Sequence, residues 1–220
     1  PVELQIATKS ERRRKRLPHP DTLGQPEMAV RVLHAFANHE LMAVELMAWA
    51  LLAYPQAPAA FRAGLVRLIV DEQRHLSLYV DRIAELGARF GDLAVNDHFW
   101  RCAQSLTTPL QWVCAMNLTF EQSNLDHAPH FEESFARVGD VRSAAIMAQI
   151  VEDEIHHVGF GAYWLKQHTG AGQSSFEVYV QNLTFHNDAV RARGPQLNVA
   201  ARRAAGLDDD FIRALEETGR

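Results

Sequence analysis

The chain has 220 residues, of which 47% are hydrophobic and 22% are charged. This length and composition predict one globular domain with a sizeable core and, at most, short extensions. No stretch approaches the roughly 18 uninterrupted apolar residues of a transmembrane helix, and no apolar leader opens the sequence as given. We therefore expect a cytoplasmic protein that does not insert into membranes.

The net charge of −5 argues against broad nucleic-acid binding. One run is an exception, because residues 12–16 are all basic, and without them the net charge would be −10: Arg12, Arg13, Arg14, Lys15 and Arg16. We interpret residues 1–25 as an extended basic arm, and the run as a solvated tail or a contact for an acidic partner. Cys102 and Cys114 have no CxxC spacing, so we interpret both as packing residues.

Hydrophobic periodicity predicts two long helices in the first part of the chain. The first runs from 26 to 53 and ends at YPQAPA, and the second runs from 58 to 87. About twenty residues without sustained periodicity follow, with a short helix around HFWRCAQSL.

Two more long helices are predicted in the second part. The third begins at the cap Thr108 with Pro109 in its first turn, kinks or restarts at Pro129, and ends at Gly139. The fourth runs from 140 to 168.

Four helices of about 28 residues, each about 42 Å long, predict an all-α four-helix bundle over residues 26–168. Short turns make each consecutive pair an antiparallel hairpin, and the longer segment between the pairs predicts one crossover along the bundle. Residues 169–220 are a C-terminal extension. It contains a fifth element in SSFEVYVQNLTFHN, for which helix and strand both remain open, and a short helix in DDDFIRALEE.

The pattern DExxH occurs twice, in VDEQRHL and in EDEIHHV. A helical projection puts Glu72 and His75 inside the apolar stripe of the second helix, and Glu154 and His157 inside that of the fourth. A buried carboxylate is costly unless it is paired or binds a metal. One such pair could belong to a satisfied polar network, but its repetition favours metal ligation.

Each predicted hairpin also has a single glutamate on an apolar face, Glu40 in the first and Glu121 in the second. The Glu of ExxH follows this residue by 32 positions in one hairpin and by 33 in the other. The chain therefore contains two copies of one metal half-site. Together they give the ligand set of di-iron and di-manganese bundles: Glu40, Glu72, His75, Glu121, Glu154 and His157.

The order E, ExxH, crossover, E, ExxH resembles the ferritin-like superfamily over about residues 30–168. The runs HELMAVELMAWALLAYP, FEQSNLDHA and NVAARRAAGL resemble a bacterial ferritin-like family without an assigned reaction. The resemblance implies a ferritin-like fold and two metal ions, iron in the first place with manganese or zinc as alternatives. It also implies that one pair of carboxylates bridges the ions, either Glu72 and Glu154 or Glu40 and Glu121.

Asp71 and Asp153 each precede the glutamate of ExxH. We expect each to accept the ring N–H of the histidine in the opposite hairpin, although both could instead be surface charges. The doubled DExxH is similar to multicomponent monooxygenases and ribonucleotide reductase small subunits. Glu45 is an alternative ligand to Glu40, because its helix is apolar over much of its circumference, whereas Asp126 should not reach the metals.

The leading functional hypothesis is an oxidoreductase in which a di-iron centre activates dioxygen or peroxide and oxidises or hydroxylates an unidentified small substrate. The alternatives are an iron-handling ferroxidase or storage protein, and a non-catalytic scaffold with a structural metal. The chain has no rubredoxin-like CxxC pair, so electrons would come from an external donor or from the substrate. We assign no catalytic residue beyond the metal centre, and a homodimer is compatible with the sequence.

Overall fold

The computed structural model describes residues 3–8, 17–184 and 188–218. The predicted basic run at 12–16 lies outside these residues. Over the part that is described, the protein is all-helical, and its only strand-like pairing is an isolated bridge between Ile6 and Val95. None of the described helices is long and apolar enough to cross a membrane.

The chain divides into two compact units. Unit 1 comprises Pro1–Leu52, Ala59–Arg101 and Phe131–Met147. Unit 2 comprises the remaining segments, which are Ala53–Pro58, Cys102–His130 and Ala148–Arg220. Two of the boundaries between the units, after His130 and after Met147, fall within helices. The prediction that residues 26–168 form one bundle domain stays a prediction.

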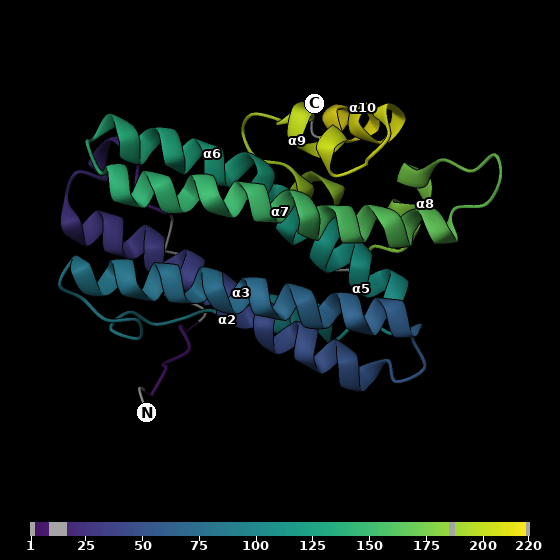
Figure 1. The fold of residues 1–220 in the computed structure, drawn as a ribbon, viewed down its shortest axis with the longest axis horizontal. Coiled ribbons are helices and arrows are strands. Elements are labelled where there is room, and N and C mark those ends of the chain that lie inside the picture. The colour runs from purple at the N-terminus through teal and green to yellow at the C-terminus, as the bar shows by residue number, and fades with distance from the viewer. Residues whose placement is uncertain (1–2, 9–16, 185–187, 219–220) are drawn as a thin grey trace. The chain divides into compact units, whose positions relative to one another are not determined.

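The first predicted hairpin is present as α2 (Pro26–Ala53) and α3 (Ala59–Glu85), so both predicted helices are confirmed to within two residues. The two helices lie side by side and run in opposite directions (Figure 1). Their facing stripes supply fully buried apolar side chains such as Leu33, Leu65 and Tyr79. The apolar positions that the hydrophobic periodicity identifies therefore form the surfaces through which the two helices pack.

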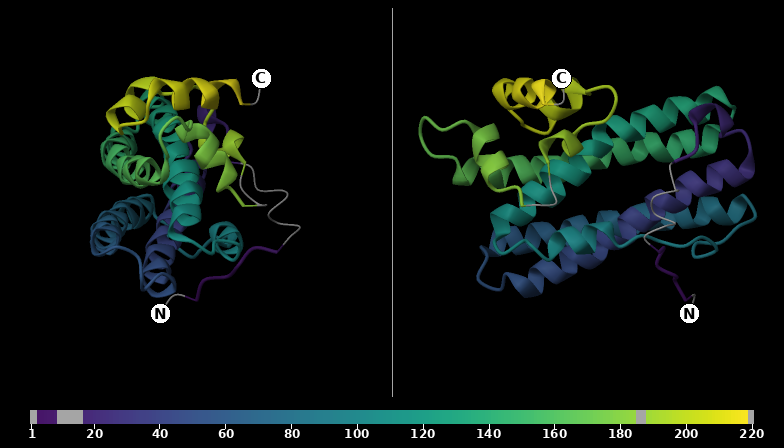
Figure 2. Two further views of the ribbon diagram at one scale, coloured as in Figure 1. Left: turned by 90° about the vertical axis from the view of Figure 1, so that its right-hand side faces the viewer. Right: turned by 180° about the vertical axis from the view of Figure 1, so that it is seen from behind.

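The segment after α3 runs back along α2 (Figure 2). Gly91 N donates to His34 Nε2 at 3.0 Å, and Asn96 N donates to Asn38 Oδ1 at 2.7 Å. Because both partners advance together along the chain, this segment is parallel to α2, as expected for the start of a crossover. The short predicted helix follows as α4 (His98–Ala103).

The third predicted helix begins where its capping signals indicate. Thr108 accepts a hydrogen bond from Gln111 N, and Pro109 occupies the first turn of α5 (Pro109–Ala115). The helix then changes form, because η2 (Met116–Glu121) is π-helical before α6 (Gln122–Arg137) resumes α-helical geometry. The sequence analysis did not predict this π-helical segment.

The helix does not restart at Pro129, because α6 continues through this residue, and the alternative of a kink there stays a prediction. Proline has no N–H, so the carbonyl of Leu125 loses its helical donor. Asn198 Nδ2 donates to that carbonyl at 3.3 Å. A side chain distant in sequence thus compensates for the missing backbone hydrogen bond.

The fourth predicted helix is α7 (Val141–His168), which lies beside α6 (Figure 1). Its predicted cap is confirmed, because Asp140 Oδ1 accepts from Ser143 N at 2.9 Å. Gly139 adopts a φ of 84°, the left-handed conformation that ends the preceding helix.

The C-terminal extension contains further short helices, so its fifth element is a helix and not a strand. They are α8 (Ser175–Gln181), η3 (Ala189–Ala192), α9 (Val199–Ala204) and α10 (Asp209–Glu217). The N-terminal arm contains one 3-10 turn, η1 (Pro20–Thr22), so its described part is not fully extended.

Candidate metal centre

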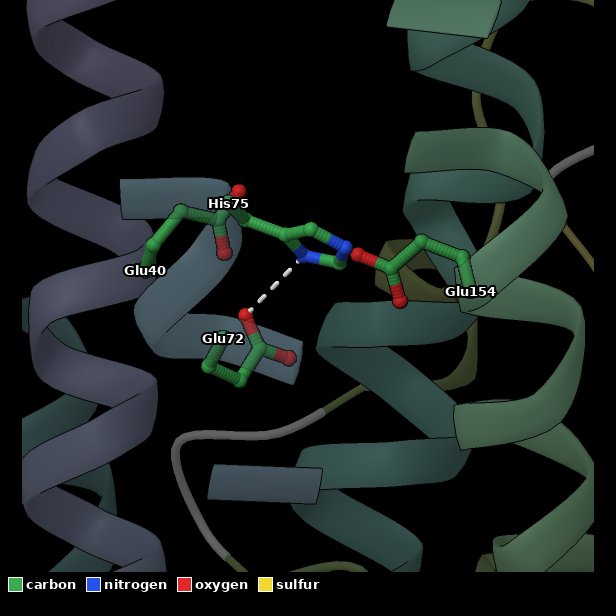
Figure 3. A group of neighbouring side chains, drawn as sticks. All are labelled: Glu40, Glu72, His75 and Glu154. Atoms are coloured by element: carbon green, nitrogen blue, oxygen red, sulfur yellow. Dashed lines mark ion pairs between the residues drawn. The ribbon is translucent and has the colours of Figure 1, made fainter. Parts of the chain in front are cut away.

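Three ligand candidates of unit 1 come together, and we call them half-site 1: Glu40 from α2, and Glu72 and His75 from α3 (Figure 3). Each offers one ligand atom within 4.8 Å of the others. Glu72 Oε2 lies 3.4 Å from His75 Nδ1. All three side chains are buried, with relative exposures of 3%, 0% and 0%.

The donor chemistry of half-site 1 fits a divalent cation. Glu40 and Glu72 bring two carboxylates close together away from water, where like charges repel strongly. A cation between them would replace this repulsion with attraction. Carboxylate oxygens combined with an imidazole nitrogen suit manganese, iron and zinc.

The corresponding residues of unit 2 form half-site 2: Glu121 from η2, and Glu154 and His157 from α7. Glu121 and His157 each offer a ligand atom within 4.8 Å of the other. Glu154 Oε2 lies 3.5 Å from His157 Nδ1. All three are buried, and Glu121 and His157 belong to a group of residues that could hold a metal ion.

Two asparagines hold the carboxylates of half-site 2 in place. Asn124 Nδ2 donates to Glu154 Oε1 at 2.9 Å. Asn117 Nδ2 donates to Glu121 Oε2 and also, at 3.2 Å, to the carbonyl of His157. These hydrogen bonds orient the ligand oxygens. In known metal sites, hydrogen bonds to the ligands strongly affect the affinity for the metal.

The π-helical segment η2 brings Asn117 and Glu121 into half-site 2. Thr119 Oγ1 donates to the carbonyl of Cys114, five residues earlier, at 2.7 Å, and it also bonds the hydroxyl of Tyr179 at 2.8 Å. Gly161 on α7 permits the close approach, because a Cβ there would lie 2.7 Å from Asn117 Cβ. Single π-helical turns within α-helices frequently occur at functional sites.

Sequence reasoning missed the two asparagines. The available signal was Asn117, four residues before Glu121 and therefore on the same face of a helix, in a segment that is otherwise apolar. Asn124 gives no comparable signal, because its partner Glu154 is 30 residues away.

The alternative ligand Glu45 is exposed, and its Oε2 accepts a hydrogen bond from Trp100 Nε1 at 2.7 Å. Glu40 is buried, which favours it as the ligand. Asp71 is partly exposed and forms an ion pair with Arg74 at 3.2 Å, and Asp153 is also partly exposed. Their proposed bonds to the opposite histidines stay predictions.

Asp126 has a structural partner that the sequence analysis did not find. Its two carboxylate oxygens bind the two terminal nitrogens of Arg202 at 2.6 and 2.9 Å, and both side chains are fully buried. Asp126 also accepts from the backbone N–H groups of Gly194 and Asn198. This bidentate pair joins the C-terminal extension to α6 within unit 2.

Both cysteines are free and buried, in agreement with a packing role. Burial raises the pKa of the Cys114 thiol to about 12. The thiol therefore stays protonated at neutral pH, and it is neither a nucleophile nor a thiolate ligand.

These features define an all-α protein with buried carboxylate and imidazole clusters that could hold metal ions. The chain belongs to the family described as Protein of unknown function (DUF455), whose sequence pattern matches residues 5–213. No curated protein and no solved structure matches the chain. The predicted relationship to the ferritin-like superfamily stays a prediction.

Proposed function

We propose that half-sites 1 and 2 together bind two metal ions within a ferritin-like bundle, and that the protein is an oxidoreductase that activates dioxygen or peroxide. The observation that supports this most is the duplication of one buried ligand set. Each half-site has two carboxylates and one imidazole on elements that recur in the same order. Iron is the first candidate, with manganese or zinc as alternatives.

The number and charge of the ligands favour two ions over one. Four carboxylates balance the charge of two divalent cations, and carboxylates can bridge them. Six protein ligands leave coordination positions open on two metals, whereas a purely structural site is normally closed by its protein ligands. Open positions favour catalysis.

A pair of bound irons would supply the redox chemistry needed to reduce dioxygen or peroxide and to oxidise or hydroxylate a substrate. The chain's own residues would hold and shield this pair. Buried ligands such as Glu72 and His157 exclude bulk water, and the amides of Asn117 and Asn124 fix the orientation of two carboxylates. We propose an external donor, or the substrate itself, as the source of electrons, and a small organic molecule as the substrate.

The direct test loads the protein with ferrous iron without oxygen, counts the irons per chain, and then follows dioxygen consumption on mixing with aerated buffer. Glu154→Ala removes a ligand, and Glu152→Ala removes an exposed carboxylate from the same helix as a matched control. We expect two irons and rapid dioxygen consumption in the wild type and in Glu152→Ala. Glu154→Ala should bind fewer irons and lose the reaction.

Other outcomes would identify the alternatives. Two bound irons that react with neither dioxygen nor peroxide would indicate a scaffold with structural metals. Continued uptake of iron far beyond two per chain would indicate an iron-handling protein. In either case the oxidoreductase proposal would be wrong.

A further inference from the structure

Unit 1 contains a cavity of about 410 Å³ between α2 and the segment that returns along it. We call it the basic pocket, because its lining includes two arginines and three histidines: Arg31, His34, His39, His98 and Arg101. Among the residues that the structure describes, no aspartate or glutamate lines it. Its volume lies within the range of small-molecule sites.

Hydrogen bonds, several of them partly buried, hold the walls of the basic pocket. Asn38 Oδ1 accepts from both the backbone N and the side-chain Nδ2 of Asn96, at 2.7 and 2.9 Å. His34, which is 3% exposed, accepts from Gly91 N. Ala7 N donates to Val95 O at 2.8 Å, which fixes the same segment from the other side. These hydrogen bonds fix the position of the segment that forms one wall of the pocket.

Both arginines can donate hydrogen bonds to a ligand. Arg31 is exposed and forms no ion pair with any residue that the structure describes. Arg101 donates from Nε to Asp97 Oδ1 at 3.1 Å, and this bond leaves its two terminal amino groups for a ligand. A planar guanidinium matches the paired oxygens of carboxylate and phosphate groups.

The remaining lining favours a ligand that also has an apolar body. Leu17, Leu93 and Val95 contribute apolar surface to the pocket. The His39 ring stacks on Phe99 with centroids 5.1 Å apart, so it presents a fixed aromatic edge. A fully hydrated inorganic ion would use only the charged part of this lining.

We propose that the basic pocket binds a small organic anion, a carboxylate or a phosphate monoester with an apolar body. This site goes beyond the proposed function, because it uses none of the metal ligand candidates and requires no metal. Arg31 and Arg101 would bind the anionic group, and the leucine and valine side chains would cover the apolar part.

Isothermal titration of the full-length protein with octanoate, octyl phosphate and octan-1-ol tests this site. We expect one or both anions to bind at least 10-fold more tightly than the neutral alcohol. The tighter of the two anions identifies the preferred head group. Arg31→Ala and Arg101→Ala should each weaken anion binding about 10-fold, whereas Arg213→Ala, at an exposed ion pair with Asp210, should leave it unchanged.

The arginine variants also separate this site from binding of the anion to a metal. Both side chains are exposed, so their removal should leave the far-ultraviolet circular dichroism spectrum unchanged. Equal affinity for octan-1-ol and octanoate would overturn the proposal, as would no anion binding at millimolar concentration. Unchanged anion affinity in both Arg31→Ala and Arg101→Ala would overturn it as well.

Discussion

Half-site 1 and half-site 2 share their ligand spacing but differ in what surrounds the single glutamate. In half-site 2, Asn117 lies four residues before this glutamate and Asn124 three residues after it, and both donate to ligand carboxylates. The same positions in half-site 1 are Phe36 and Ala43, whose side chains have no donor. One half-site is therefore positioned by amide hydrogen bonds, and the other has apolar packing at these positions.

The two half-sites also differ in the backbone conformation around the single glutamate. Glu40 lies on the regular helix α2, whereas Glu121 lies in the π-helical η2. A duplicated ligand pattern thus does not imply a duplicated environment. We expect the two half-sites to differ in metal affinity, with the hydrogen-bonded half-site 2 binding more tightly, because its ligands are better oriented before binding.

The largest expected effect comes from removing an imidazole. His75→Ala and His157→Ala should each lose at least one metal ion per chain, as measured by elemental analysis after dialysis. His156→Ala, at an exposed position beside one ligand, should retain both ions. Full metal content in His157→Ala would contradict the assignment of half-site 2.

Glu45 and Asp126 lie five positions after the single glutamates Glu40 and Glu121, and we expect their removal to have very different effects on stability. Asp126→Ala would leave the Arg202 charge buried without its partner, and should lower the free energy of unfolding by about 3–5 kcal/mol. Glu45→Ala removes an exposed acceptor of Trp100 and should cost no more than about 0.5 kcal/mol. Urea unfolding of both variants measures the difference, and equal costs would show that the buried pair does not anchor the C-terminal extension.

A smaller effect is expected from the amide donors. Asn124→Ala should weaken metal binding about 10–100-fold, because Glu154 would lose the bond that orients it. Competition with a chelator of known affinity measures this change. Asn182→Ala, which removes a local bond to the Val178 carbonyl on α8, is the control. If both variants bind metal like the wild type, the amide bonds do not explain the asymmetry of the half-sites.

The smallest expected effect is on stability and comes from the ion pair between Arg82 of α3 and Asp140, which caps α7. Helix α3 also carries two ligand candidates of half-site 1. Burial opposes ionisation of Asp140, but hydrogen bonds from Ser143 and the hydrogen bond and charge of Arg82 outweigh it, so the pKa of Asp140 lies below its usual 3.8. A lowered folded-state pKa stabilises the protein above the unfolded-state value, and this contribution is lost as pH falls through the lowered value.

Asp140→Asn keeps an oxygen that can cap α7 but removes the charge that pairs with Arg82, so it should cost up to about 1 kcal/mol of unfolding free energy at pH 7, the usual upper scale of such an ion pair. The difference from the wild type should shrink as the pH falls below about 3.8. Asp210→Asn, at an exposed position, is the control for charge removal. A cost that does not change with pH would contradict a role for the ionised carboxylate.

The sequence was sufficient to predict the elements whose signals are local. The bounds of α2 follow from periodicity and a terminating YPQAPA, and the start of α5 follows from Thr108 and Pro109. The burial of Glu72 and His75 could be predicted because a helical projection needs only the residues of one helix.

The features that escaped prediction depend on contacts between distant segments. The π-helical η2 accompanies a close approach at Gly161, about 40 residues later, and α6 passes Pro129 with a donor from Asn198. Arg202 lies in the alanine-rich run NVAARRAAGL, and its burial depends on Asp126, 76 residues earlier. No pattern within one helix contains these pairings.

The most direct test of the central claim is the number of metal ions and the distance between them, measured by X-ray absorption on iron-loaded protein. If the two half-sites form one dinuclear centre, there should be two irons per chain about 3.5–4 Å apart. One iron or none per chain, or two irons too far apart to share a carboxylate, would contradict it.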